Sequence, residues 1–253
     1  MIPTVPVTRY VTPLREGGSL PGLVEAADLG TYVCKFRSAG QGVRVLAAEV
    51  LATSLVGAAG LRTPRLVVLD LDPEIARYEA DEEVQDLLNA SAGLNLGVDF
   101  LPGSFGFDTH ATVADDLALQ VLWLDAFLAN VDRSWRNPNL LMWHRDLWLI
   151  DHGASLYFHH AWAGGLTDPA RFAVQRWSAD DHVFAGLVPR LPEIDADMRE
   201  RLGPAVFRQA ADEIPDAWLA GVPEAGPDRV REAYVDFLSA RLESHDWMPG
   251  VPR

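Results

Sequence analysis

Hydrophobic and polar positions divide the chain into an early part that favours strands and a later part that favours helices. Residues 23–26 and 31–36 are short runs rich in β-branched and aromatic side chains, and the turn between them predicts a hairpin. Residues 43–59 are rich in alanine and leucine at helical spacing, and Gly60 ends the run. Residues 226–244 also have helical periodicity. Strands followed by helices predict the α+β class.

A break at Pro102 and Gly103 is the predicted boundary between two lobes. Residues 1–102 form the first lobe, with a sheet and one principal helix, and residues 103–253 form a mainly helical second lobe. The length of 253 residues suits one large domain or two lobes that share a cleft. Residues 114–129 predict a buried helix with two aspartates in its first turn, where negative charge suits the positive end of the helix dipole.

Composition and charge disfavour several classes of protein. With 21 Lys and Arg against 36 Asp and Glu, the net charge is −15, which argues against nonspecific binding to nucleic acid or to an anionic membrane surface. Cys34 is the only cysteine, so no internal disulfide or cysteine zinc cluster can form, and the chain fits a reducing compartment. The longest apolar stretch, residues 117–128, contains Asp125 and is shorter than the ~20 residues of a spanning helix. We therefore expect a soluble, cytoplasmic protein.

A polar loop after the buried helix carries the strongest candidate chemistry. Asp132 is followed five residues later by Asn137, and Asp151 stands further on, at the end of an apolar run and two residues before Gly153. Phosphoryl transfer needs one aspartate to orient or deprotonate the attacking hydroxyl, and it needs an asparagine and a second aspartate to hold magnesium. Magnesium favours a few carboxylate or carbonyl oxygens and completes its shell with phosphates and water. Asp132, Asn137 and Asp151 supply these groups.

The first half of the chain supplies candidates for holding a nucleotide. The turn at Gly17, Gly18 and Ser19 could cover phosphates, because glycines let backbone N–H groups approach closely. Lys35 sits on the strand after that turn, and Glu49 interrupts the apolar face of the following helix. A lysine that grips the α- and β-phosphates and a helix glutamate that holds this lysine are the pair that such a site requires.

The order of these features along the chain resembles that of a protein-kinase-like fold. The features are the glycine turn, the strand lysine, the helix glutamate, the Asp-Arg-x-x-x-Asn loop and the Asp-x-Gly turn. The chain is most similar to the HipA-like kinases, which share features with phosphoinositide kinases, over roughly residues 15–185. Their catalytic loop reads Asp-Arg-His-x-x-Asn, which is kept here as Asp132, Arg133 and Asn137, with Ser134 in place of the histidine. A further departure is His152, which stands where Phe is common.

The resemblance implies an ATP- and Mg²⁺-dependent kinase that phosphorylates a hydroxyl group, in the first instance of a protein Ser or Thr. It implies that Asp132 is the base, that Asn137 and Asp151 bind magnesium, and that Lys35 binds phosphates with Glu49 orienting it. By position alone, a hinge whose backbone meets adenine would comprise Asp99, Phe100 and Leu101.

The resemblance also implies a regulatory site and a partner. Ser19 is the candidate for an autophosphorylated loop serine that switches activity off, and an antitoxin-like protein is a possible partner that the sequence does not name. Two other functions stay open at this point: a small-molecule or lipid kinase, and a kinase-like module that binds nucleotide without turnover or serves as a scaffold.

Several other residues invite a simpler interpretation. The triplet from His144 to Asp146 spells the catalytic triplet of eukaryotic kinases, but it lies between two apolar runs and predicts a hairpin turn. His159 and His160 are adjacent and point opposite ways on an extended segment, so with His152 they predict packing or substrate-loop contacts rather than a metal site. The core is expected to include the tryptophans at 135, 143 and 148. For Arg133 and Arg136, pairing with phosphate and pairing in salt bridges are equally open.

Overall fold

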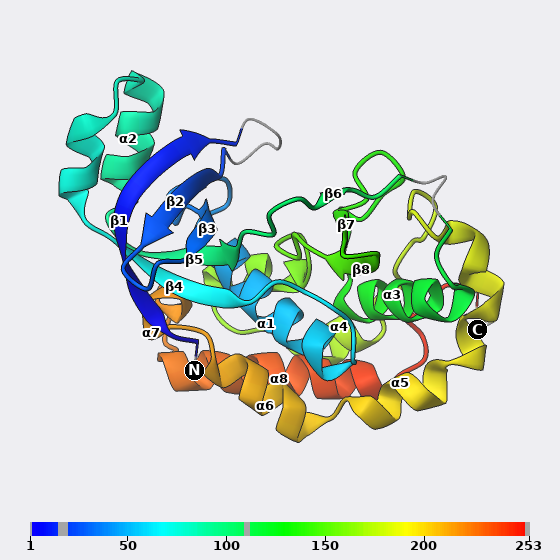
Figure 1. Ribbon diagram of the computed structural model, residues 1–253. Coiled ribbons are helices and arrows are strands. Elements are labelled where there is room, and N and C mark those ends of the chain that lie inside the picture. Colours follow the sequence, from blue (N-terminus) through cyan, green and yellow to red (C-terminus); the bar gives the residue numbers. More distant parts are fainter. Residues whose placement is uncertain (1, 15–19, 109–111, 251–253) are drawn as a thin grey trace. The chain divides into compact units, whose positions relative to one another are not determined.

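The computed structural model of the protein describes residues 2–14, 20–108 and 112–250 (Figure 1). Its contacts divide the chain into two compact units. The first unit comprises Met1–Ala47 and Pro64–Pro102, and the second comprises Ala48–Thr63 and Gly103–Arg253. Residues 48–63, which the sequence analysis assigns to the first lobe, therefore group with the second unit, and helix α1 (Val43–Ala58) runs from one unit into the other.

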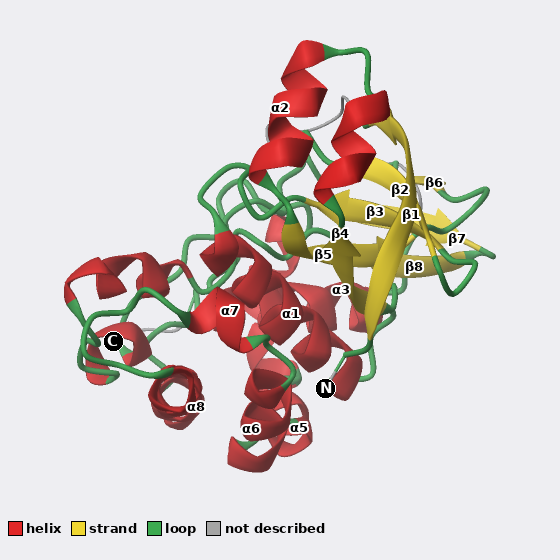
Figure 2. Cartoon of the chain, turned by 90° about the vertical axis from the view of Figure 1, so that its left-hand side faces the viewer, coloured by secondary structure: helices red, strands yellow, loops and turns green. Residues whose placement is uncertain are grey.

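The first unit is built on a closed five-stranded barrel, drawn in yellow in Figure 2. All neighbouring strands are antiparallel except the first and the fourth, which run parallel. The hairpin expected over residues 23–36 is confirmed, with Leu23 opposite Val33 and Val24 opposite Tyr32. In barrel order the strands are β1 (Thr4–Pro13), β2 (Gly22–Ala26), β3 (Thr31–Lys35), β5 (Gly93–Asp99) and β4 (Leu66–Leu71).

Alternate residues of these strands fill the barrel. Val24, Tyr32, Cys34, Val67 and Leu69 are all fully buried, as the two-residue period of a strand requires. Burial raises the pKa of the Cys34 thiol, so this cysteine is an unreactive core residue. Outside the barrel, the apolar side chains of the short helix η1 (Pro73–Tyr78) and of α2 (Glu82–Ala90) extend the same core.

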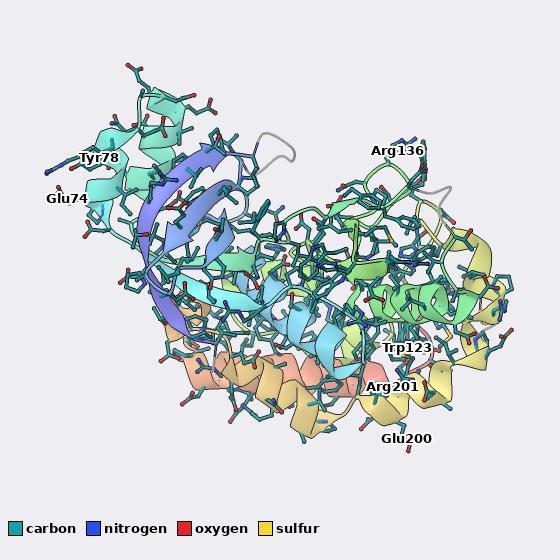
Figure 3. All side chains as sticks on the ribbon, in the orientation of Figure 1. Glu74, Tyr78, Trp123, Arg136, Glu200 and Arg201 are labelled. Carbon is teal, nitrogen blue, oxygen red and sulfur yellow. The ribbon has the colours of Figure 1, made fainter. Side chains whose placement is uncertain are left out.

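The second unit is mainly helical and is organised around α3 (Asp115–Leu128), whose side chains from Ala118 to Leu128 are buried with one exception, Gln120. Trp123 of this helix, labelled in Figure 3, stacks on Phe127 with the ring centroids 5.3 Å apart. The surrounding elements are η2 (Tyr157–Gly164), α4 (Ala170–Ala173), η3 (Ala185–Glu193), α5 (Asp195–Arg201), α6 (Pro204–Asp212), α7 (Asp216–Leu219) and α8 (Pro227–Glu243).

The C-terminal end of α3 is fixed by a buried arginine of α8. Arg241 donates hydrogen bonds to the carbonyls of Ala126 and Phe127 at 2.8 and 2.7 Å. The last carbonyls of a helix have no partner within the helix, so a guanidinium is a suitable ligand for them. Ala129 follows in the left-handed conformation, with φ 53°, and turns the chain into the polar loop.

A small sheet in the same unit carries the segment before Asp151. It consists of β6 (Phe105–Gly106), β7 (Leu140–Trp143) and β8 (Asp146–Leu149). His144 and Arg145 have φ of 51° and 72° and connect β7 to β8 as a two-residue turn. The turn predicted for the His-Arg-Asp triplet is confirmed. Among the helices that the structure describes, none combines the length and the apolar character needed to cross a bilayer.

Gly97 of β5 offers a test of the barrel packing. A Cβ atom at this position would lie 2.6 Å from Val67 Cγ2 and 2.8 Å from Leu69 Cγ, so Gly97→Ala overpacks the core. We expect a loss of about 1–3 kcal/mol in the free energy of unfolding, measured by urea denaturation.

Gly57 in α1 is the control, because it is exposed and its Cβ would meet nothing within 4 Å. Gly57→Ala should stabilise by roughly 0.5–1 kcal/mol, the difference in helix propensity. Equal effects of the two substitutions would contradict the packing described for β5.

Candidate active site

The loop that follows α3 is anchored at its first residue. Asn130 donates from its side-chain nitrogen to Asp125 Oδ1 at 2.8 Å, and its side-chain oxygen accepts from the backbone N–H of Asp132 at 3.1 Å. Its own backbone carbonyl accepts from Trp177 Nε1 at 2.7 Å. Asn130 therefore connects the backbone of Asp132 to the buried end of α3.

The carboxylate of Asp132 is held by two amides. Asn137 Nδ2 and Asn139 Nδ2 both donate to Asp132 Oδ2, at 3.1 and 3.0 Å. The structure thus brings Asp132 and Asn137 together, as the sequence spacing predicts. Asn139 was missed, because its only signal in the sequence is that it is a second asparagine, directly after Pro138. In the structure it adopts a left-handed conformation (φ 49°), which asparagine tolerates.

A buried ion pair fixes the backbone of this loop. Arg133 Nε lies 2.6 Å from Asp125 Oδ2, with 0% and 3% of the two side chains exposed. Arg133 Nη1 also donates to the carbonyls of Pro138 (3.2 Å), Asn139 and Ile150 (3.5 Å). Of the two interpretations left open for Arg133, the structure selects the salt bridge. Its guanidinium spans the loop and the residue immediately before Asp151.

Asp125 receives a second buried partner from a distant segment. His182 Nε2 lies 3.1 Å from Asp125 Oδ2, while His182 Nδ1 accepts from the backbone N–H of Phe184 at 3.1 Å. Because Nδ1 is an acceptor, the proton resides on Nε2 and points at the carboxylate. His182 also forms an isolated β-bridge with Ser134, the residue that replaces the family's histidine. The histidine that contacts this loop is therefore His182, from a later segment of the chain, and not a histidine of the loop itself.

Electrostatics keep Asp125 ionised despite its burial. Desolvation alone would raise the pKa of this carboxyl, but Arg133, His182 and Asn130 together outweigh it and lower the pKa from 3.8 to about 2. The carboxylate is therefore charged at neutral pH, as the pairing with Arg133 requires.

Asp151 is positioned through the same network. The backbone N–H of Ile150 donates to the carbonyl of Asn139 at 3.0 Å, and the side chain of Asn139 contacts Asp132. Asp151 is exposed and has φ 54°, a left-handed conformation that costs a non-glycine residue of order 1–3 kcal/mol. One residue, Asn139, therefore joins the loop of Asp132 to the strand end that carries Asp151.

The turn after Asp151 rests on helix α1. His152 is buried, and its Nδ1 lies 3.3 Å from Thr53 Oγ1 and 3.5 Å from Glu49 Oε1. Glu49 itself is 2% exposed. His152 was expected to replace a packing residue; it packs, and it also gives Glu49 a polar contact that the sequence analysis did not foresee.

The remaining predicted residues belong to the first unit. Lys35 is the last residue of β3 and lies opposite Leu96 of β5. At the predicted hinge, the N–H groups of Asp99 and Phe100 donate to the carbonyls of Arg65 and Thr31, at 2.9 and 3.0 Å. Both amides are therefore engaged within the sheet. Gly17, Gly18 and Ser19 lie outside the described residues.

Two expectations about aromatic and histidine residues have different outcomes. Trp135, expected in the core, is 53% exposed, so that prediction is wrong; Trp143 and Trp148 are half-buried and pack edge to face. His159 and His160 lie in the 3-10 helix η2 and not on the extended segment that was expected. His159 does pack, because it is buried and its Nδ1 is hydrogen-bonded with the hydroxyl of Tyr234 at 2.8 Å. In the part of the chain that the structure describes, no group of three or more His, Cys, Asp or Glu residues could hold a metal ion.

The side-chain oxygens of Asn137 and Asp151 are nevertheless of the kind that magnesium binds. Asp151 is an exposed carboxylate. Asn137 donates a hydrogen bond to Asp132 from its amide nitrogen, so its amide oxygen can serve as a metal ligand. Magnesium is commonly held by one or two carboxylates together with substrate phosphates and water, so a cluster of three acidic ligands is not required.

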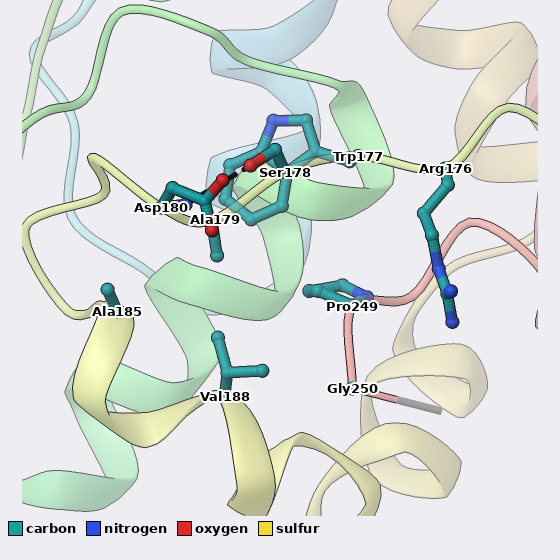
Figure 4. A pocket seen from close by; sticks show the side chains of 9 residues that line it. All are labelled: Arg176, Trp177, Ser178, Ala179, Asp180, Ala185, Val188, Pro249 and Gly250. Carbon is teal, nitrogen blue, oxygen red and sulfur yellow. Dashed lines mark hydrogen bonds between the residues drawn. The ribbon is translucent and has the colours of Figure 1, made fainter. Parts of the chain in front are cut away.

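The second unit also contains a cavity of about 540 Å³ (Figure 4). None of the predicted site residues lines it. It is lined by Arg176, Trp177, Ser178, Ala179, Asp180, Ala185, Val188, Pro249 and Gly250.

Comparison with known proteins supports a kinase fold. A family model described as HipA-like kinase matches residues 7–246. The Helicobacter pylori proinflammatory kinase CtkA is similar over 90% of this chain and 88% of its own, with 12% identity and a TM-score of 0.50. At this identity the likeness shows the fold alone, and the prediction of an α+β, protein-kinase-like fold is confirmed.

Two solved structures of the Golgi casein kinase are also similar to the chain. The Golgi casein kinase matches with 12% identity and a TM-score of 0.46, over 95% of this chain and 72% of its own. Its structure with Mn/ADP bound matches with 11% identity and a TM-score of 0.47, over 98% of this chain and 78% of its own. The chain matches no curated protein sequence.

The buried pair predicts a specific dependence of stability on pH. The pKa of Asp125 is lower in the folded protein than its ordinary 3.8, so its stabilisation is present above pH 4 and is lost as the pH falls toward 2. The drop to about 2 corresponds to roughly 2 kcal/mol. Asp125→Asn removes this dependence and leaves the Arg133 guanidinium buried without its counter-ion, which should cost about 3–5 kcal/mol.

Urea denaturation between pH 7 and pH 2.5 measures both effects. Asp115→Asn, in the first turn of the same helix, is the control, because Asp115 is 65% exposed and pairs with Arg190 at the surface. That substitution should cost far less than Asp125→Asn, because exposed ion pairs contribute little to stability. Similar losses in the two variants would show that the buried pair does not anchor the loop.

Proposed function

The chain belongs to the HipA-like kinase family and is a phosphotransferase, and from this premise we propose that it transfers the γ-phosphate of ATP, with Mg²⁺, to the hydroxyl of a protein Ser or Thr. One observation carries the proposal. The side chain of Asn139 donates a hydrogen bond to the carboxylate of Asp132. The backbone carbonyl of Asn139 accepts one from the N–H of Ile150, the residue before Asp151. A base and a metal-binding carboxylate on adjoining segments are the minimum that this chemistry needs.

Asp132 is proposed as the base. Its Oδ2 is occupied by the two amides of Asn137 and Asn139, so the orientation of the carboxylate is fixed before substrate arrives. The acceptor hydroxyl would give its proton to this carboxylate as its oxygen bonds to the γ-phosphorus and ADP departs. Positioning of this kind supplies most of the catalysis in phosphoryl transfer.

Asn137 and Asp151 are proposed to hold Mg²⁺ through their side-chain oxygens. When bound, the ion neutralises charge on the nucleotide phosphates. The buried contact of His152 with Glu49 fixes the turn that carries Asp151, so this carboxylate has a defined backbone although its side chain is exposed.

Residues of the first unit complete the proposal. Lys35 would bind the α- and β-phosphates, with Glu49 orienting it, and Gly17, Gly18 and Ser19 would cover the phosphates. At the hinge, the amides of Asp99 and Phe100 are engaged, so hydrogen bonds to adenine would come from backbone carbonyls or from the amide of Leu101. We also propose a cytoplasmic location, which the single cysteine of the sequence, Cys34, favours. An antitoxin-like partner is proposed from the family resemblance.

Substitution of single aspartates tests the assignment. Asp132→Asn should lower kcat by about 10²- to 10⁴-fold, the usual contribution of a positioned base, and should keep nucleotide binding. Asp151→Ala should abolish the Mg²⁺-dependent part of ATP binding. ADP release measures turnover, and the thermal shift with ATP and Mg²⁺ measures binding.

Asp146→Asn is the matched control. Asp146 belongs to the His-Arg-Asp turn and pairs at the surface with Arg62 at 3.2 Å, so both activities should stay near those of the unmodified protein. Turnover at the normal rate in Asp132→Asn would refute its role as base. Nucleotide binding without turnover in the unmodified protein would instead identify a binding module.

A further inference from the structure

An aromatic residue and a cation lie stacked and exposed on the loop that carries Asp132. The Trp135 side chain is 53% exposed, and the guanidinium carbon of Arg136 lies 4.0 Å from the centroid of its ring. Arg136 is 66% exposed at the outer surface of the second unit (Figure 3). Trp and Arg are among the residues enriched at protein–protein interfaces and among those whose loss weakens binding most.

The backbone beneath this stack is held in place. The N–H of Trp135 donates to the carbonyl of Asp181 at 3.0 Å, and Ser134 is bridged to His182. On the other side, the N–H of Asn137 donates to Ser134 Oγ at 3.1 Å. The exposed pair is therefore a preorganised feature of the loop, which lowers the entropy cost of binding a ligand.

The charge of Arg136 is only weakly compensated. Its ion-pair partner among the described residues is Asp181, at 3.8 Å, with 66% and 75% of the two side chains exposed. Pairs of this kind contribute little, so a ligand carboxylate could displace Asp181 at small cost. Stacking covers one face of the guanidinium and leaves its N–H edge able to bind a carboxylate in bidentate fashion.

The position of the stack defines what it could recognise. Arg136 is four residues from Asp132, a span of at most about 14 Å even for extended chain. An extended acceptor peptide with its hydroxyl at Asp132 could therefore place a side chain up to about four residues away against Arg136. Val131, which is 65% exposed beside Asp132, adds apolar surface.

We propose that Trp135 and Arg136 form an acceptor-recognition site that selects protein segments carrying an Asp or Glu within about four residues of the phosphorylated Ser or Thr. The inference rests on the proposed kinase function and adds its substrate class. Trp135 supplies the apolar surface on which the peptide packs, and Arg136 supplies the charge that distinguishes an acidic peptide from a basic one.

A peptide library tests the site directly. Each peptide carries a central Ser or Thr with Glu or Lys at one of the four positions on either side, and kcat/KM is measured with ATP and Mg²⁺. The unmodified protein should prefer Glu over Lys about tenfold or more at one or more positions. Arg136→Glu should reverse this preference, and a reversal cannot arise from misfolding.

Further variants separate the two side chains. Trp135→Ala should lower kcat/KM for Glu and Lys peptides alike, mainly through KM, and Trp135→Phe should restore most of the loss. Arg229→Glu is the matched control, because Arg229 is also exposed (56%) and pairs with acidic residues at the surface of α8. It should keep the Glu preference of the unmodified protein.

The outcomes distinguish this inference from the proposed kinase function. Identical peptide profiles in the unmodified protein and Arg136→Glu overturn the recognition site. Transfer to small molecules or lipids with none to any library peptide also overturns it and leaves phosphotransfer standing. The kinase function is judged separately, by ADP release and by the Mg²⁺-dependent thermal shift that Asp151→Ala should lose.

Discussion

The buried ion pair between Asp125 and Arg133 is the constraint on which the candidate site depends. Two charges removed from water are costly, and the cost is offset only when every partner is well placed. Here the carboxylate also contacts Asn130 and His182, and the guanidinium also donates to three backbone carbonyls. The pair therefore favours this geometry of the loop, because separating Asp125 from Arg133 would leave each charge buried without its counter-ion.

The loop after α3 is held by buried side chains on its inner side, whereas its candidate catalytic side chains reach the surface. Asp151 is exposed and Asp132 is half-buried, which fits the proposed roles of both residues in meeting substrate. The left-handed backbone at Asp151 and Asn139 is tolerated because the buried network holds the residues on either side. If Asp132 is the base as proposed, the candidate site combines the two properties that phosphoryl transfer demands, positioning and access.

The contact between His152 and Glu49 extends this constraint to helix α1. A shift of α1 within the second unit would move the partner of His152 and with it the turn that carries Asp151. The departure from the family's usual residue at 152 therefore replaces an apolar contact by a polar one at the same turn. This couples the position of Glu49 to that of the metal-binding carboxylate proposed above.

The sequence by itself determined the features that arise from short-range order. The hairpin over residues 23–36, the buried helix before the polar loop and the turn at His144 follow from local periodicity and turn chemistry, and the spacing of Asp132 and Asn137 places both on one loop. Only the tertiary structure decided that His182 and Asn139 join the site and that Trp135 is exposed. Asp125 and His182 are far apart in sequence and meet only because the chain packs, and no local pattern records such a contact.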